Sequence, residues 1–213
     1  MTVSLHRQRH GPCPCGSMRS FATCCLPWEE ALQRLMARLI GFAATAAVRR
    51  LERGAFDVFM GREGTSPTRS AVGEATALRF LEWFLHDYVP RPGEGPLLGL
   101  FADGAVGLDA REEELLLASL LTPVRAYEVS ESPGPRGIVV RDLLTGAEGR
   151  VGILGFNDMP IRSDTLICRL LPTGRLLRTG AGVLQLPAIC REELLVYLRT
   201  TYQMGRPGRH VPL

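Results

Sequence analysis

The segment Cys13–Cys25 reads CPCGSMRSFATCC and contains four of the six cysteines of the chain. Zinc prefers four soft ligands at the corners of a tetrahedron, with Zn–S distances of about 2.3 Å. A close pair of cysteines, a short loop and a second close pair can surround such an ion without a large core. The spacing therefore predicts a zinc knuckle that binds Zn²⁺ through the four thiolates, Cys13, Cys15, Cys24 and Cys25. With no open coordination position, this site is expected to be structural rather than catalytic.

The loop between the two pairs starts with Gly16 and Ser17, which suit a tight turn whose N–H groups point toward the sulfurs. The Cys-Pro-Cys-Gly-Ser opening, the eight-residue gap and the closing Cys-Cys pair resemble the SEC-C motif. This motif is named for the C-terminal tail of the protein-secretion ATPase SecA, and Phe21 stands where the family usually has an aromatic residue. Two positions depart from the pattern. Met18 replaces a glycine, and the lysine-rich stretch of the family is reduced to Arg19.

Two histidines, His6 and His10, lie just upstream of the knuckle. His10 is an alternative ligand, although four thiolates already fill a tetrahedral sphere. Zinc with four thiolates carries 2 − 4 = −2, which lowers the formal charge of the chain from +3 to +1. Long-range attraction to nucleic acid is correspondingly weak.

The bulk composition is that of a globular protein, with 46% hydrophobic and 22% charged residues in 213. All 25 basic residues are arginine, so chemistry that needs a lysine, such as Schiff-base catalysis, is excluded. The N-terminus has no apolar signal region, and the longest apolar stretch is too short to span a bilayer. We expect a cytoplasmic protein without a membrane span, in which cysteines serve as metal ligands or free thiols.

Apolar periodicity and turn residues predict helices in the first part of the chain and short strands after it. The expected helices cover Pro27 to Arg53, with a possible kink at Gly41, then Arg69 to Tyr88 and Ala110 to Leu121, the last opening on a capping box at Asp109. The expected strands are Tyr127 to Ser130, Ile138 to Leu143, Arg150 to Leu154, Thr165 to Leu171, Arg175 to Thr179 and Val183 to Leu186. A last helix is expected from Ala188 to Tyr202.

The predicted fold class is α+β, with a zinc knuckle, a helical region, a small antiparallel barrel-like β unit and a C-terminal helix. The corresponding division is 11–26 for the SEC-C knuckle, 27–122 for the helical region, 123–204 for the β unit with its helix, and 205–213 for a flexible tail. The order also resembles a group of uncharacterised bacterial proteins with a SEC-C knuckle in front. The residues that carry this looser resemblance are Glu82-Trp83-Phe84, Tyr127-Glu128-Val129 and Arg141 to Gly146.

The sequence contains only weak candidates for the residues of an active site. His86-Asp87 suits a helix C-terminus, where a cationic histidine is favourable, better than acid–base catalysis. Arg141-Asp142 is expected to hold a hairpin or to mark a ligand-binding rim. Cys168 reads as a buried thiol, Cys190 has no evident partner base, and the glycines of Gly180-Ala181-Gly182 read as a turn.

The leading hypothesis is a zinc-dependent, non-catalytic adaptor whose knuckle presents Phe21 and Arg19 to a protein partner. In SecA the equivalent tail recruits the chaperone SecB, so the resemblance implies a role near secretion, chaperones or ribosomes. The alternative is a nucleic-acid-binding module that acts through arginines of the β unit, namely Arg141, Arg150, Arg162, Arg169 and Arg175. A third hypothesis, an enzyme, requires a deep polar pocket around His86 or Asp142. The oligomeric state is left open.

Overall fold

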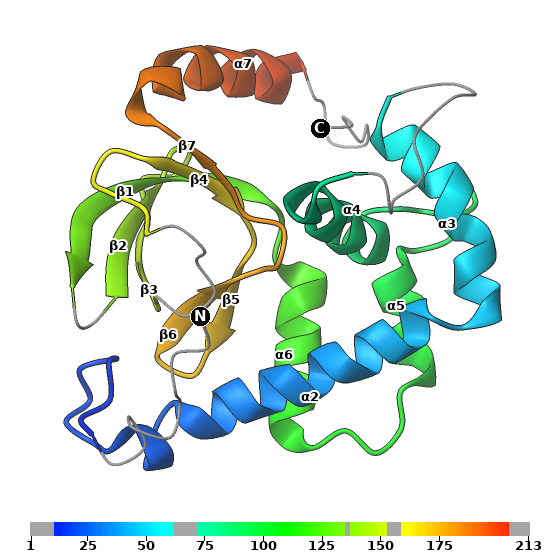
Figure 1. The fold of residues 1–213 in the computed structure, drawn as a ribbon, viewed down its shortest axis with the longest axis horizontal. Helices are drawn as coiled ribbons and strands as arrows, with labels where there is room; N and C mark the ends of the chain where they lie inside the picture. The colour runs from blue at the N-terminus through cyan, green and yellow to red at the C-terminus, as the bar shows by residue number, and fades with distance from the viewer. Residues whose placement is uncertain (1–10, 62–71, 135–136, 153–158, 205–213) are drawn as a thin grey trace.

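The computed structural model describes residues 11–61, 72–134, 137–152 and 159–204 (Figure 1). Within these residues the helices are α2 (Leu26–Ala43), α3 (Ala46–Phe59), α4 (Glu74–His86), α5 (Leu97–Gly104), α6 (Ala110–Leu121) and α7 (Arg191–Met204). The strands are β1 (Arg125–Gly134), β2 (Gly137–Asp142), β3 (Glu148–Val151), β4 (Thr165–Cys168), β5 (Leu170–Thr173), β6 (Leu176–Thr179) and β7 (Leu184–Leu186). Two 3-10 turns, η1 (Phe21–Thr23) and η3 (Ala188–Cys190), precede α2 and α7. The predicted tail, 205–213, lies outside the described residues.

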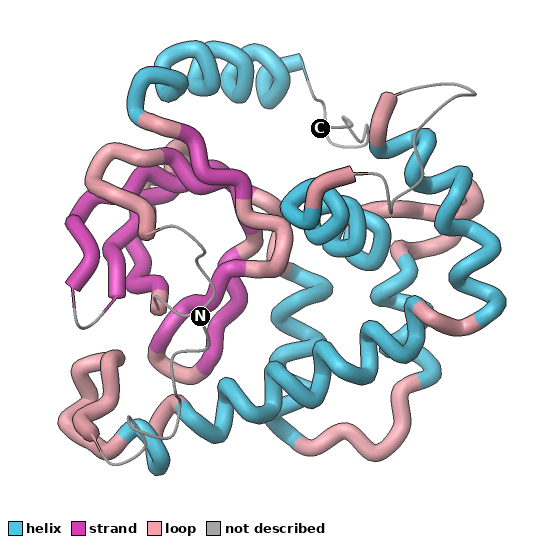
Figure 2. The backbone as a smooth tube through the Cα atoms, in the orientation of Figure 1, coloured by secondary structure: helices cyan, strands magenta, loops and turns pink. Residues whose placement is uncertain are grey.

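The strands form one curled sheet in the order β5-β6-β3-β2-β1-β4-β7, which makes a half-barrel (Figure 2). The α+β class is confirmed, but the expectation of a purely antiparallel unit is wrong. β3 and β6 run parallel, with Val151 opposite Leu177, and the other neighbouring pairs are antiparallel. The difference arises because the β5–β6 hairpin joins the far edge of the sheet, beside β3, rather than continuing from β4.

The predicted helix from Pro27 to Arg53 is two helices, α2 and α3, which are bent by 83°. The break lies at Thr45 rather than at Gly41. The backbone of Thr45 is extended, and its hydroxyl donates a 2.8 Å hydrogen bond to the Phe42 carbonyl. Apolar periodicity continues across the break because both helices face the same core. Periodicity alone therefore could not locate the bend.

Two further elements differ from the expectation. The predicted strand from Thr165 to Leu171 is split into β4 and β5 at Arg169, whose buried side chain faces α4. Helix α5 was not predicted, because Gly99, Gly104 and the preceding Pro96 are residues typical of a loop. Burial of Leu97, Leu98 and Phe101 stabilises this short helix in spite of its low propensity.

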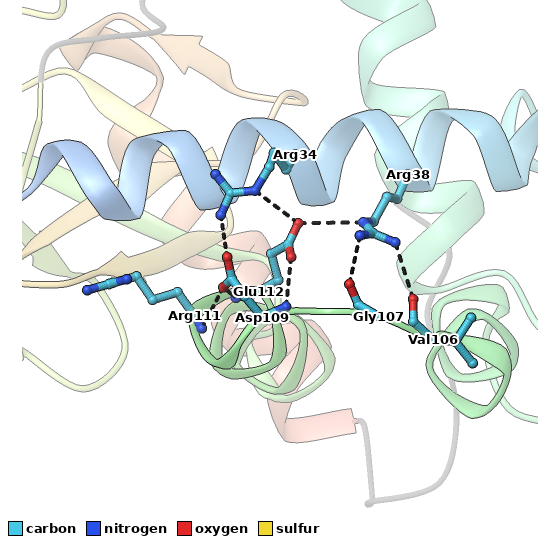
Figure 3. Close-up of polar contacts among 7 residues, drawn as sticks. All are labelled: Arg34, Arg38, Val106, Gly107, Asp109, Arg111 and Glu112. Carbon is cyan, nitrogen blue, oxygen red and sulfur yellow. Dashed lines mark hydrogen bonds and ion pairs between the residues drawn. The ribbon is translucent and has the colours of Figure 1, made fainter.

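Helix α6 has the predicted bounds, and its capping box is present: the Asp109 side chain accepts from the Glu112 N–H, while Glu112 accepts from the Asp109 N–H. Figure 3 shows that this cap also joins α6 to α2. Arg34 of α2 pairs with Asp109 at 2.5 Å, and Arg38 lies 3.5 Å from the buried Glu112 carboxylate. Arg38 also donates to the Val106 and Gly107 carbonyls, so charges on α2 satisfy both the cap and the loop before it.

The buried apolar residues fall into three clusters. The largest joins the five helices α2, α3, α4, α5 and α6, the second is formed by residues of strands β1 to β5, and the third joins the N-terminal cysteines to β6. The third cluster is formed by Cys13, Phe21, Cys25, Leu26 and Leu176. It fixes the cysteine segment against the β5–β6 hairpin. The predicted division of the chain into units stays a prediction.

Candidate metal centre

The sulfur atoms of the four N-terminal cysteines all lie within 4.8 Å of one another. Cys15 Sγ is 3.5 Å from Cys24 Sγ, and Cys25 Sγ is 3.9 Å from Cys24 Sγ. Cys13 and Cys25 are buried, whereas Cys15 and Cys24 are partly exposed. All six cysteines of the chain are free thiols. The four N-terminal cysteines therefore form a group that can hold one metal ion.

The backbone of the segment brings the two cysteine pairs together. The Cys13 N–H donates to the Arg19 carbonyl at 2.8 Å, and the Gly16 N–H donates to the Cys13 carbonyl at 3.1 Å. These bonds close a small loop, which requires positive φ at two positions, 77° at Gly16 and 59° at Met18. Met18 thus adopts the left-handed conformation, which glycine adopts without strain but a residue with a Cβ does not. The loop forms at the cost of local backbone strain.

Hydrogen bonds to sulfur surround the group. Ser17 Oγ lies 3.1 Å from Cys24 Sγ. Burial alone raises the pKa of Cys15, but hydrogen bonds from Ser17 and from Cys13 outweigh it and lower this pKa to about 6. Burial raises the pKa of Cys25, opposed by a backbone hydrogen bond from Arg175. Donors to sulfur stabilise thiolates, so these hydrogen bonds favour the ligand form of Cys15, whereas burial raises the pKa of Cys13 and of Cys25.

The knuckle rests on the β5–β6 hairpin. Phe21 is 1% exposed and packs with Leu26 and Leu176, so the expectation that Phe21 faces a partner is wrong. Gly174, at the turn of the hairpin, has a φ of 70°, and a Cβ there would lie 2.7 Å from Trp28 Cδ1. Phe21 is therefore buried by packing within the chain and is not available to a partner. Two neighbouring side chains of the loop, those of Met18, at 96%, and Arg19, are exposed.

A buried ion pair fixes the same junction from the other side. Arg178 of β6 and Glu29 of α2 lie 2.5 Å apart, with 5% and 10% of their side chains exposed. This pair was not predicted, because the two residues are far apart in the chain and neither lies in a motif. The one indication of this pair in the sequence is Glu29, an acidic residue in the first turn of α2 that is buried together with apolar residues of the same helix.

His86 lies in the last turn of α4 and Asp87 is its C-cap residue, as expected, but His86 is largely buried and not at the surface. Burial, followed by the charge of Arg169, lowers the pKa of His86 to about 4, so this histidine is neutral near pH 7. Asp87 pairs with Arg169, which also lies 3.5 Å from Glu82. The Glu82 carboxylate accepts from the Gly182 N–H at 2.5 Å, and a Cβ at Gly180 would lie 2.5 Å from both of its oxygens. The Gly180-Ala181-Gly182 turn therefore binds a carboxylate of this chain.

Arg141 and Asp142 hold the hairpin, as expected, but through separate partners. Asp142 pairs with Arg125 at 3.0 Å and accepts from the Leu144 and Thr145 N–H groups, while Arg141 pairs with Glu128 at 2.6 Å. Cys168 is buried, and burial raises its pKa, followed by the charge of Glu82. Cys190 is half-buried in η3. His10 lies outside the described residues.

The five arginines predicted to bind nucleic acid differ in their exposure and in their ion pairs. Arg141 and Arg169 are in ion pairs with Glu128 and Asp87, and Arg169 is 3% exposed. Arg162 and Arg175 are exposed, and Arg150 is half-buried. These five side chains therefore do not provide five available cations.

Among the described helices, none is by itself both long and apolar enough to cross a membrane; α2 and α3 meet that test only when taken together. Comparison of the chain with protein-family models, with curated proteins and with solved structures finds no match.

Proposed function

We propose that this chain is a zinc-binding, non-catalytic adaptor of the SEC-C type, in which Cys13, Cys15, Cys24 and Cys25 hold one zinc ion. The observation that carries the proposal is the clustering of four sulfurs within 4.8 Å of one another. A regular tetrahedron with Zn–S bonds of about 2.3 Å has S···S edges of about 3.8 Å. The separations of 3.5 Å and 3.9 Å to Cys24 lie on either side of this value.

Zinc, when bound, supplies a closed tetrahedral centre that fixes the loop. Residues of the chain stabilise the site around the ion. Ser17 and the backbone N–H of Arg175 donate hydrogen bonds to sulfur, and Leu176 packs against the buried cysteines. A segment this short buries too little apolar surface to fold alone. The metal therefore stabilises the ordered form of the loop that carries Met18 and Arg19.

The partner-binding surface is this exposed loop. Met18 offers an unbranched, polarisable side chain, which adapts well to a protein surface, and Arg19 can form a bidentate bond with a carboxylate. We propose a protein partner in secretion, chaperone or ribosome-associated processes, which is what the resemblance to the tail of SecA implies. The cytoplasm is the compartment in which such a partner is met.

The test is quantitative capture of partners from a cytosolic extract by four baits. These are the wild type, a Met18→Ser/Arg19→Ser variant, a Cys24→Ser/Cys25→Ser variant and a Met159→Ser control. Met159 is exposed and is not part of the knuckle segment, so its substitution repeats the loss of an exposed methionine. We expect one set of proteins to be retained by wild type and control and lost from both knuckle variants. Identical capture by all four baits would refute the adaptor function.

Nucleic-acid binding remains the second candidate, supported by the exposed Arg162 and Arg175. It is the weaker proposal because Arg141 and Arg169 are committed to carboxylates of the same chain. Capture that survives nuclease treatment favours the protein partner, whereas capture lost on that treatment favours nucleic acid.

A further inference from the structure

A cavity of about 220 Å³ lies between α3, α4 and the β4–β7 edge of the sheet, away from the knuckle. Its walls are mainly apolar and include Phe59, Trp83, Val124, Ile167 and Leu184. Small-molecule sites have this character: an apolar body with a few polar groups at defined positions. A cavity of about 150 Å³ in another protein holds benzene, so this volume suits a body slightly larger than a single ring.

The polar groups of this cavity come from one face of α4, where Arg79, Glu82, Trp83 and Asp87 follow helical spacing. Both carboxylates already have partners. Asp87 accepts from Arg169, and Glu82 accepts from the Gly182 N–H and lies 3.5 Å from Arg169. Neither negative charge is therefore left to recruit a cation into the cavity.

Arg79 differs from these two groups. In the part of the chain that the structure describes, its guanidinium donates to Thr76 Oγ1 at 3.0 Å and has no ion-pair partner. Burial raises the pKa of Glu82, opposed by the hydrogen bond from the Gly182 N–H and by the charge of Arg169. The unpaired charge at this cavity is thus positive, and a planar guanidinium matches a carboxylate in geometry as well as charge.

We propose that this cavity binds a small monocarboxylate with an apolar or aromatic body, whose carboxylate pairs with Arg79 while its body lies among Phe59, Trp83 and Leu184. The ligand is recognised by one charged bond at the rim and by burial of its apolar part. This binding function is independent of the knuckle and of the metal.

Three probes of similar shape separate the charge of the ligand from its apolar body: phenylacetate, the neutral phenylacetamide and the cationic phenethylamine. They are titrated calorimetrically into the full-length, zinc-loaded protein. Phenylacetate is expected to bind with millimolar or tighter affinity and to bind better than both analogues.

Arg79→Gln removes the cation and keeps a donor for Thr76. It is expected to weaken phenylacetate binding by about tenfold, the effect of losing a charge-assisted bond. Arg91→Gln is the matched control, since Arg91 is 77% exposed, pairs with Glu94 and does not line the cavity. Leu184→Trp fills the cavity and is expected to abolish binding of all three probes.

Retention of phenylacetate binding in Arg79→Gln, or an equal loss in Arg91→Gln, would overturn the proposal. So would preference for phenethylamine, which would make this a cation site, or no heat from phenylacetate up to about 10 mM. Far-UV circular dichroism of each variant verifies that the fold is retained. Because Arg79→Gln alters a partly exposed side chain with one hydrogen bond, it tests the proposal even if Leu184→Trp does not fold.

Discussion

His86 should make the protein less stable as the pH falls, by an amount that its surroundings define. Its imidazole is largely buried at the end of α4, its Nδ1 has no hydrogen-bond partner among the residues that the structure describes, and the Arg169 guanidinium lies nearby. Burial first, and then the charge of Arg169, lower its pKa from 6.5 to about 4, with Asp87 opposing. The folded protein therefore keeps His86 neutral where the unfolded chain binds a proton.

The sign of the effect follows from proton linkage. Between pH 6.5 and pH 4 the unfolded state binds more protons than the folded state, so the free energy of unfolding decreases as the pH falls. The full shift corresponds to about 3 kcal/mol. Between pH 7 and pH 5 the expected loss from His86 alone is about 2 kcal/mol.

Replacement of His86 by glutamine removes the titrating group and retains hydrogen-bonding capacity. Urea unfolding of the wild type and of His86→Gln is measured at pH 7 and at pH 5, and the change with pH is compared. Glu82 contributes with the opposite sign, because its raised pKa favours proton uptake by the folded state, but it is present in both proteins. We expect the wild type to lose about 2 kcal/mol more than the variant over this range.

The same loss in both proteins would show that His86 is not held neutral by burial. A smaller loss in the wild type than in the variant would reverse the sign and contradict the placement of His86 beside Arg169. Only the difference between pH values is used, so any change in stability at pH 7 caused by the substitution does not affect the conclusion.

Three substitutions near the knuckle test its packing by urea unfolding of the zinc-loaded protein. Met18→Gly should stabilise by about 1 kcal/mol, because it relieves a φ of 59° and loses no packing from a side chain that is 96% exposed; a destabilised variant would contradict this. Gly174→Ala should destabilise by more than 1 kcal/mol, since the added Cβ meets Trp28 and φ is 70°; a neutral result would show that the hairpin does not press on Trp28. Glu29→Ala should cost about 3 kcal/mol or more, because it leaves the Arg178 cation buried; a loss below 1 kcal/mol would show that water reaches this pair.

Sequence patterns predicted the structure well where local chemistry decides it. The bounds of α6 follow from the capping box at Asp109 and from Pro123 after its end. The four clustered cysteines were identified by their spacing, and the turn at Gly16 with its sulfur-directed donors followed from residue type. In each case the deciding contacts lie within a few residues of one another.

The predictions failed where contacts between distant segments decide. Phe21 is buried because the β5–β6 hairpin, near the other end of the chain, packs on the knuckle. The strand predicted across Arg169 is split because the side chain of that arginine forms ion pairs with Glu82 of α4 and with Asp87 at the end of that helix. The parallel pairing of β3 with β6 likewise depends on where a hairpin docks, which residue alternation does not encode.

The metal content of the purified protein shows whether the four N-terminal cysteines bind one zinc ion. Zinc is measured by inductively coupled plasma mass spectrometry in the wild type, in Cys24→Ser/Cys25→Ser and in a Cys190→Ser control, in which a half-buried cysteine outside the knuckle is changed. We expect about one zinc per chain in the wild type and in the control, and almost none in the double variant. A wild type without zinc, or a double variant that retains it, would show that these four cysteines do not form a zinc site.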